Sequence, residues 1–177
     1  MKYLSIISLS VLITVAGCTR LEPKLYSDLT TANAYSTESD INAALVGVYA
    51  DLNPYPGDAW MYYAGYLVMT TDYSTDMGFS TAAGDPTKMS NFTYDDNNRY
   101  IRYNWQYMYN VISNVNLLLS KIEGVQMDET KKKRIIGQAR FLRALAYRDI
   151  TDAWGPAPLY TKVVAPEETV NAALATV

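Results

Sequence analysis

Apolar residues recur at helical spacing in three parts of the chain, and the first part lies between residues 41 and 52. Apolar positions there repeat every three or four residues, which predicts a helix with one buried stripe. Thr37–Asp40 resembles a capping box with Asp in place of Glu, and Pro54 stops the pattern. The stripe that we expect in the core comprises Ile41, Ala44, Leu45, Val48, Tyr49 and Leu52.

Two longer stripes follow, over residues 99–123 and 128–154. Asp128 is placed to cap the second helix, and Gly155 with Pro156 is placed to end it. Two long helices joined by a short turn predict an antiparallel hairpin. The inward positions that we expect are Trp105, Met108, Ile112, Val115, Leu119 and Ile122 in the first helix, and Ile135, Ala139, Leu142, Ala146, Ile150 and Ala153 in the second.

The stretch between the first helix and the hairpin has no helical period. Residues 60–69 are too continuously apolar for periodicity to separate a helix from a buried strand, and we favour a helix. From Thr70 to Asn98 the chain is rich in small and polar residues, which predicts a long irregular loop with little regular structure. Loops of this length in a folded domain are usually functional or disordered. The fold class expected from the three stripes is all-α.

The N-terminus has the pattern of a secretion signal. One positive charge at Lys2 precedes an apolar run from Leu4 to Val15 that is too short to span a bilayer. Val15-Ala16-Gly17-Cys18 resembles a bacterial lipobox, and Cys18 is the only cysteine of the chain. We therefore expect a signal peptide over residues 1–17, lipidation of Cys18 with acyl chains such as palmitate, and a tether over 18–35.

The remaining residues, 36–177, are expected to form one helical domain. Pro166-Glu167-Glu168 has the pattern of the first turn of a further helix, with Pro at its start and acidic side chains at the positive end of the dipole. A helix that begins nine residues before the end has nothing to pack on. This pattern predicts that the chain is the N-terminal part of a longer protein.

Charge and composition exclude several classes of function. Without residues 1–17, 14 Lys and Arg face 18 Asp and Glu, which disfavours binding to nucleic acid. The chain has no His, which excludes Ser-His and Cys-His nucleophilic sites and His-based zinc sites. We expect no cofactor and no resident metal. A carboxylate-dependent glycosidase using Asp72 with Asp76, or Asp95 with Asp96, is a weaker alternative, because loop carboxylates are usually turn residues.

Several segments together resemble a known family. Residues 137–147 read GQARFLRALAY and are followed by WGPAPL at 154–159. Residues 105–118 match a W-x-x-x-Y-x-x-I-x-x-x-N-x-L pattern, and residues 29–49 match the first helix of the same family. In this order the segments resemble the SusD/RagB family of nutrient-binding outer-membrane lipoproteins of Bacteroidetes. Gln138 stands where the family usually has Glu, and Pro156-Ala157 replaces a commoner pair.

The resemblance implies a fold, a location and a partner. It implies tetratricopeptide-like helical hairpins, lipid anchoring at the outer membrane on the extracellular side, and no enzymatic activity. The partner would be a TonB-dependent SusC-like transporter that receives a glycan or another nutrient. The alternative is a helical-repeat scaffold of the cell envelope that binds no nutrient.

A sugar site needs a flat aromatic face together with polar groups for the hydroxyls. The segment 60–98 has both, and the chain has 16 Tyr and 3 Trp against 3 Phe. We predict that Arg140 and Arg143 instead hold the two long helices together. The predicted ligand contacts are Tyr73, Asp76, Tyr94 and Asn97, with Trp60 as a further aromatic platform.

Overall fold

The computed structural model describes residues 34–52, 65, 67–165, 168 and 174. The chain divides into two units, residues 1–30 and 31–177, and the description below concerns the second alone. The predicted signal peptide, Cys18, most of the tether and Trp60 lie outside the described residues. The predicted helix start at Pro166 does too, except for Glu168, which is helical.

The first helix, α2 (Glu38–Asp51), begins at the predicted capping box. The Asp40 N–H donates to the Thr37 hydroxyl at 3.2 Å, and the Thr37 N–H donates to the Asp40 carboxylate at 2.8 Å. Hydrogen bonding with Thr37, supplemented by the Ser36 N–H, lowers the pKa of Asp40. Two otherwise unpaired groups at the helix start are thereby satisfied, which explains why α2 begins at this point.

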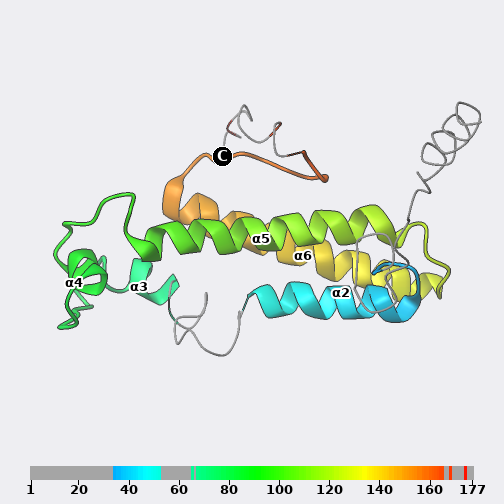
Figure 1. Cartoon of the computed structure of the whole chain (residues 1–177), viewed down its shortest axis with the longest axis horizontal. Coiled ribbons are helices and arrows are strands. Elements are labelled where there is room, and N and C mark those ends of the chain that lie inside the picture. The colour runs from blue at the N-terminus through cyan, green and yellow to red at the C-terminus, as the bar shows by residue number, and fades with distance from the viewer. Residues whose placement is uncertain (1–33, 53–64, 66, 166–167, 169–173, 175–177) are drawn as a thin grey trace, which may run out of the picture. The chain divides into compact units, whose positions relative to one another are not determined.

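The predicted hairpin forms from α5 (Arg99–Ile122) and α6 (Glu129–Trp154). Asn98 caps α5 by accepting from the Tyr100 N–H, and Asp128 caps α6 by accepting from the Lys131 N–H at 2.9 Å. At the other end of α6, Gly155 adopts φ +74°, a conformation that side chains disfavour. The two helices lie antiparallel, as Figure 1 shows.

α2 packs along the half of the hairpin that is nearest its turn (Figure 1). Lys131 donates to Glu38 at 2.6 Å, and the Tyr49 hydroxyl donates to Gln138 at 3.0 Å, so α2 is paired with α6 along its length. Asn114 joins α5 to Asp51 at the far end of α2. These contacts define one three-helix unit.

The core of this unit is apolar and fully enclosed. Each buried aliphatic side chain contributes about 1.5–3 kcal/mol to folding. The predicted stripes supply most of the core residues. Tyr49, however, is 43% exposed and Ala153 is exposed, so those two positions were predicted wrongly. The core residues are Ile41, Leu45, Val48, Met108, Val111, Ile112, Val115, Leu118, Ile122, Val125, Ile135, Ala139, Leu142, Ala146, Ile150 and Ala157.

Two short helices lie near the start of α5: α3 (Leu67–Thr71) and α4 (Asp85–Ser90). The prediction of little regular structure over 70–98 is therefore wrong for α4. Its start has Asp85 and Pro86 in the first turn, which are helix-initiating residues that the polar composition obscured. Gly78 lies so close to the Asp72 carbonyl that an added Cβ would be 2.2 Å from its oxygen, so the loop between the two helices requires glycine there.

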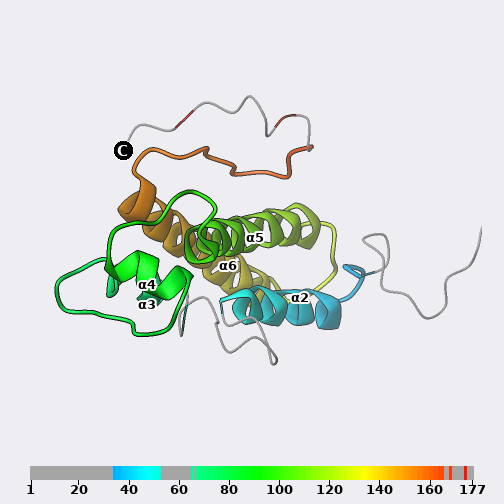
Figure 2. The ribbon, with the colours of Figure 1, turned by 60° about the vertical axis from the view of Figure 1, so that its left-hand side comes forward.

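After α6 the chain doubles back along the hairpin, on the side opposite α2, as the views in Figures 1 and 2 agree. We call residues 155–165 the C-terminal strap. Side chains of both long helices bind its backbone carbonyls. Asn116 donates to the Tyr160 and Lys162 oxygens at 3.0 Å, and Tyr109 donates to the Pro158 oxygen at 2.9 Å.

Arg143 completes this attachment. Its guanidinium donates to the Asn116 side-chain oxygen at 2.6 Å and to the Thr161 carbonyl at 2.9 Å. The prediction that Arg143 holds the helix pair together is confirmed, because it joins α6 to α5 as well as to the strap. Arg140 is exposed and makes no hydrogen bond or ion pair with the described residues, so the same prediction is wrong for Arg140.

Candidate functional site

A cavity of about 710 Å³ opens at the end of the hairpin that is far from its turn. Its described wall comes from α3 and the residues just after it, from the end of α4 and the start of α5 with the segment that joins them, and from the last two turns of α6. Four kinds of group line it: aromatic rings, aliphatic side chains, hydroxyls and charged groups. Such a mixed lining is typical of a site for a small polar ligand.

Among the described residues, two aromatic side chains line the cavity. Tyr94 is 39% exposed and comes from the segment between α4 and α5. Trp154 ends α6 and packs edge-on against Trp105, with ring centroids 5.5 Å apart and planes at 75°. That contact fixes Trp154 in place, so the cavity has one anchored indole and one accessible phenol.

The charged part of the wall comes from one side of α6. Arg148 donates from Nε to Asp149 at 2.9 Å, and the same nitrogen lies 3.7 Å from the Asp152 carboxylate. Asp149 is almost fully buried, with 2% of its side chain exposed, whereas the side chains of Arg148 and Asp152 are 60% and 72% exposed. The buried carboxylate therefore fixes the guanidinium, and the exposed groups remain accessible to solvent.

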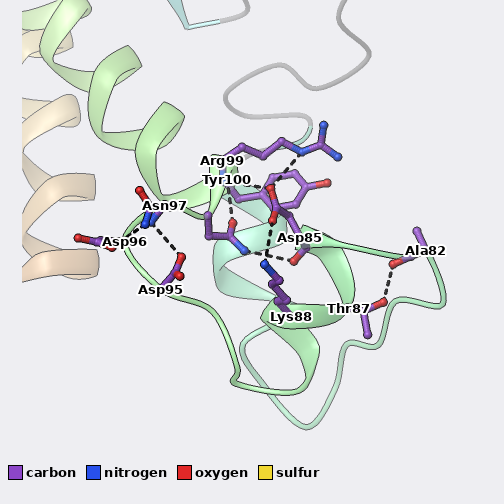
Figure 3. A network of polar contacts seen from close by, with 10 residues as sticks. Ala82, Asp85, Thr87, Lys88, Asp95, Asp96, Asn97, Arg99 and Tyr100 are labelled. Atoms are coloured by element: carbon purple, nitrogen blue, oxygen red, sulfur yellow. Dashed lines mark hydrogen bonds and ion pairs between the residues drawn. The ribbon is translucent and has the colours of Figure 1, made fainter.

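The segment that bears Tyr94 is fixed by a polar network at its ends (Figure 3). Asp85 lies 3.6 Å from the Arg99 guanidinium, and this ion pair joins the start of α4 to the start of α5. Within α4, Asp85 also lies 3.9 Å from the Lys88 ammonium. The Asn98 side chain donates to the Asp85 carbonyl at 3.3 Å. α4 and α5 are thus connected on either side of Tyr94.

An unusual backbone conformation lies two residues before Tyr94. Phe92 adopts φ +54°, which a residue with a Cβ disfavours, and its ring is 62% exposed. Its N–H donates to the Met89 carbonyl and the Thr93 N–H donates to the Lys88 carbonyl, which is the Schellman pattern at a helix end. Glycine is the usual residue at this position, so Phe92 is strained.

The structure brings one of the predicted ligand contacts, Tyr94, to the cavity. Tyr73 is half-buried and packs against Met89 and Tyr100. Asp76 is exposed in the loop between α3 and α4. As ligand contacts all of these residues stay predictions.

Asn97 lies in the turn that leads into α5. Its N–H donates to the Asp95 carboxylate at 3.0 Å, and its amide donates to Asp96 at 3.3 Å (Figure 3). This is the local hydrogen bonding by which Asp and Asn stabilise turns. Asp95 and Asp96 therefore have a structural role in that turn, whatever else they contact.

The sequence prediction did not include Arg148, Asp152 and Trp154 among the site residues. They lie on a helix whose pattern indicates packing, and only the opposite charges at positions 148 and 152 marked that side of α6 as polar. Among the described residues no group of three or more Asp, Glu, Cys or His side chains could hold a metal ion.

A second, smaller cavity of about 350 Å³ lies between α5 and the C-terminal strap. Tyr109, Asn116 and Tyr160 line it, and all three are already used to attach the strap. We assign this space to packing of the strap, and the larger cavity is the candidate site.

Comparison with known proteins places the chain in a family. A SusD-like family model, described as "Starch-binding associating with outer membrane", matches residues 21–177. SusD-like protein P2 of Formosa agariphila is 26% identical over 97% of the chain and 34% of its own length. SusD-like protein P25 of the same organism is 30% identical over 76% of the chain and 26% of its own length. The chain thus spans about a third or less of the curated relatives that it matches.

Solved structures agree in fold. A SusD-like carbohydrate-binding protein of Bacteroides fragilis superposes with a TM-score of 0.67 at 24% identity, over 80% of this chain and 28% of that one. A laminarin-binding SusD-like protein gives a TM-score of 0.66 at 28% identity, over 80% of this chain and 31% of that one. The all-α, tetratricopeptide-like fold and the resemblance read from the sequence are confirmed, and the chain belongs to the SusD-like family.

Proposed function

We propose that the chain is the N-terminal part of an outer-membrane lipoprotein that binds a glycan without cleaving it. The glycan would then pass to a TonB-dependent SusC-like transporter, over which the protein sits on the extracellular side. The observation that carries the proposal is the 710 Å³ cavity, whose lining combines Tyr94 with hydroxyl and charged groups.

This lining meets the chemical requirements of a sugar. The C–H face of a pyranose ring packs on an aromatic ring, as offered by Tyr94 and Trp154. Sugar hydroxyls both donate and accept, so Thr71, Ser74 and the Arg148–Asp152 pair supply partners of both kinds. The cavity volume is within the range of small-molecule sites, about 300–1,000 Å³.

Attachment through Cys18 is the second part of the proposal. In the described part of the chain, no helix has the length and apolar character needed to cross a bilayer. Several acyl chains on one cysteine would hold the protein at the membrane, since each buried CH₂ contributes about 0.8 kcal/mol. The matched family model, which describes association with the outer membrane, supports this location.

Binding of the 177-residue chain to laminarin and to soluble starch, measured by isothermal titration calorimetry, tests the proposal. The two glycans are chosen because one solved relative binds laminarin and the family model is described as starch-binding. We expect Tyr94→Ala to weaken binding about ten-fold, which corresponds to about 1.4 kcal/mol.

Phe141→Ala is the matched control, because Phe141 is an exposed ring on α6, 65% accessible against 39% for Tyr94, and does not line the cavity. It should leave the affinity unchanged. Absence of heat with both glycans and with a wider glycan array would contradict glycan binding and favour a scaffold protein. Release of reducing ends during incubation would instead identify a glycosidase.

A further inference from the structure

The charged groups of the cavity do not balance. Among the described residues that line it, Arg148, Asp149 and Asp152 are the charged ones, so its wall has one positive and two negative side chains. Arg148 and Asp149 are in direct contact, which makes that pair neutral. The exposed Asp152 carboxylate adds a second negative charge, so the described part of the lining is net negative.

Arg148 therefore is not an open site for an anion. Its guanidinium already lies between two carboxylates, one buried beneath it and one beside it at 3.7 Å. An incoming carboxylate or sulfate at Arg148 would also be repelled by the exposed Asp152 carboxylate, which lies 3.7 Å from Arg148 Nε. Uncharged hydroxyls meet no such repulsion, because they donate to a carboxylate and accept from a guanidinium at the same time.

We infer that this cavity selects neutral glycans and discriminates against those with carboxylate or sulfate groups. The inference rests on the proposed function and adds the chemical class of the ligand. Asp152 is the residue that sets the discrimination, since it is the exposed carboxylate of the wall. The buried Asp149 carboxylate positions Arg148 by accepting from its guanidinium.

The experiment compares derivatives of one glycan backbone. Hydroxyethyl and carboxymethyl forms of laminarin and of starch have substituents of similar size and differ in charge. With the 177-residue chain at about 20 mM salt, we expect the carboxymethyl form to bind about five-fold more weakly than the hydroxyethyl form for each carboxylate near the wall. The ratio of the two dissociation constants should approach one at about 0.5 M salt, because screening removes the repulsion.

Two variants separate Asp152 from the general charge of the protein. Asp152→Asn should reduce the ratio toward one, whereas Glu123→Gln, which removes an exposed carboxylate at the hairpin turn, away from the cavity, should leave it unchanged. Equal or tighter binding of the carboxymethyl form, or an unchanged ratio in Asp152→Asn, would overturn the inference while leaving glycan binding intact. If none of the parent or derivatised glycans binds, the proposed function itself fails.

Discussion

Phe92 shows at the scale of one residue that local strain is kept next to the candidate site. Its backbone has a positive φ in the Schellman turn after α4, where only glycine avoids steric cost. Because the ring is 62% exposed, its burial contributes little free energy to offset the backbone strain. Strained positions concentrate at functional sites, and this one lies two residues from Tyr94.

Relieving the strain at Phe92 should stabilise the fold. We expect Phe92→Gly to raise the free energy of unfolding by about 1 kcal/mol, because the αL conformation costs a residue with a Cβ about 1–2 kcal/mol. Urea titration followed by circular dichroism measures it. Phe92→Ala retains the Cβ and should give no gain, so equal stabilisation by both substitutions would contradict the strain argument.

At the scale of an element, the sequence motifs of α5 and α6 hold the C-terminal strap. Tyr109 and Asn116 belong to the motif of α5, and Arg143 and Tyr147 belong to the motif of α6. All four bind backbone oxygens or nitrogens of residues 158–162. The motif residues thus attach the strap through its backbone, in addition to the burial of Ala157 and the packing of the Tyr160 ring on Tyr109.

Asn116 is the centre of this attachment and should be the most sensitive position. Asn116→Ala removes two donors to the strap and leaves Arg143 without its side-chain acceptor, so we expect a loss of about 3 kcal/mol in unfolding free energy. Asn114→Ala on the same helix removes one exposed hydrogen bond to Asp51 and should cost about 1 kcal/mol or less. Similar small losses for both variants would show that the strap is not attached in this way.

The two tyrosines of the attachment predict a response to alkaline pH. Burial raises the pKa of Tyr109 and of Tyr147 above the ordinary value near 10. The fold therefore favours their neutral forms, so the stability that they contribute is complete below pH 10 and is lost as the pH rises above it. We expect the double variant Tyr109→Phe/Tyr147→Phe to be less stable than wild type at pH 7.

Above pH 10 the same double variant should lose less additional stability than wild type. Urea titrations at about pH 8, 10 and 11 measure this difference. Tyr94→Phe, at an exposed phenol outside the attachment, is the control and should follow wild type. An identical alkaline loss in wild type and in the double variant would contradict the role of burial.

The elements differ in how far the sequence could predict them. α2, α5 and α6 have long apolar periods and residues of the capping type at their ends, so local rules located them within a residue or two. α4 has six residues and too short a period to detect. The cavity was only partly predictable. Tyr94 lies on a polar segment, whereas Arg148 and Asp152 become site residues only because the fold brings α3 and the end of α6, which are distant in sequence, to the same cavity.

At the scale of the whole unit of residues 31–177, the start of α2 lies at one end of α6 and the cavity lies at the other end. The Glu38–Lys131 ion pair places the start of α2 beside the first turn of α6. From Lys131 to Arg148, α6 extends about 26 Å, at about 1.5 Å per residue. A lipid anchor at Cys18 would therefore be connected to the unit far from the residues that line the cavity.

This separation predicts that anchoring and glycan binding are independent. Deleting residues 1–33 should abolish membrane attachment and leave the dissociation constant for a bound glycan within about two-fold of wild type, a change below 0.5 kcal/mol. Cys18→Ser keeps residues 18–33 and removes only the lipid acceptor, so it should match the deletion in both measurements, made by membrane fractionation and calorimetry. If the deletion weakens binding and Cys18→Ser does not, residues 18–33 themselves contribute to the site. That result would contradict the separation of the two ends, because the start of α2 and the cavity lie at opposite ends of α6.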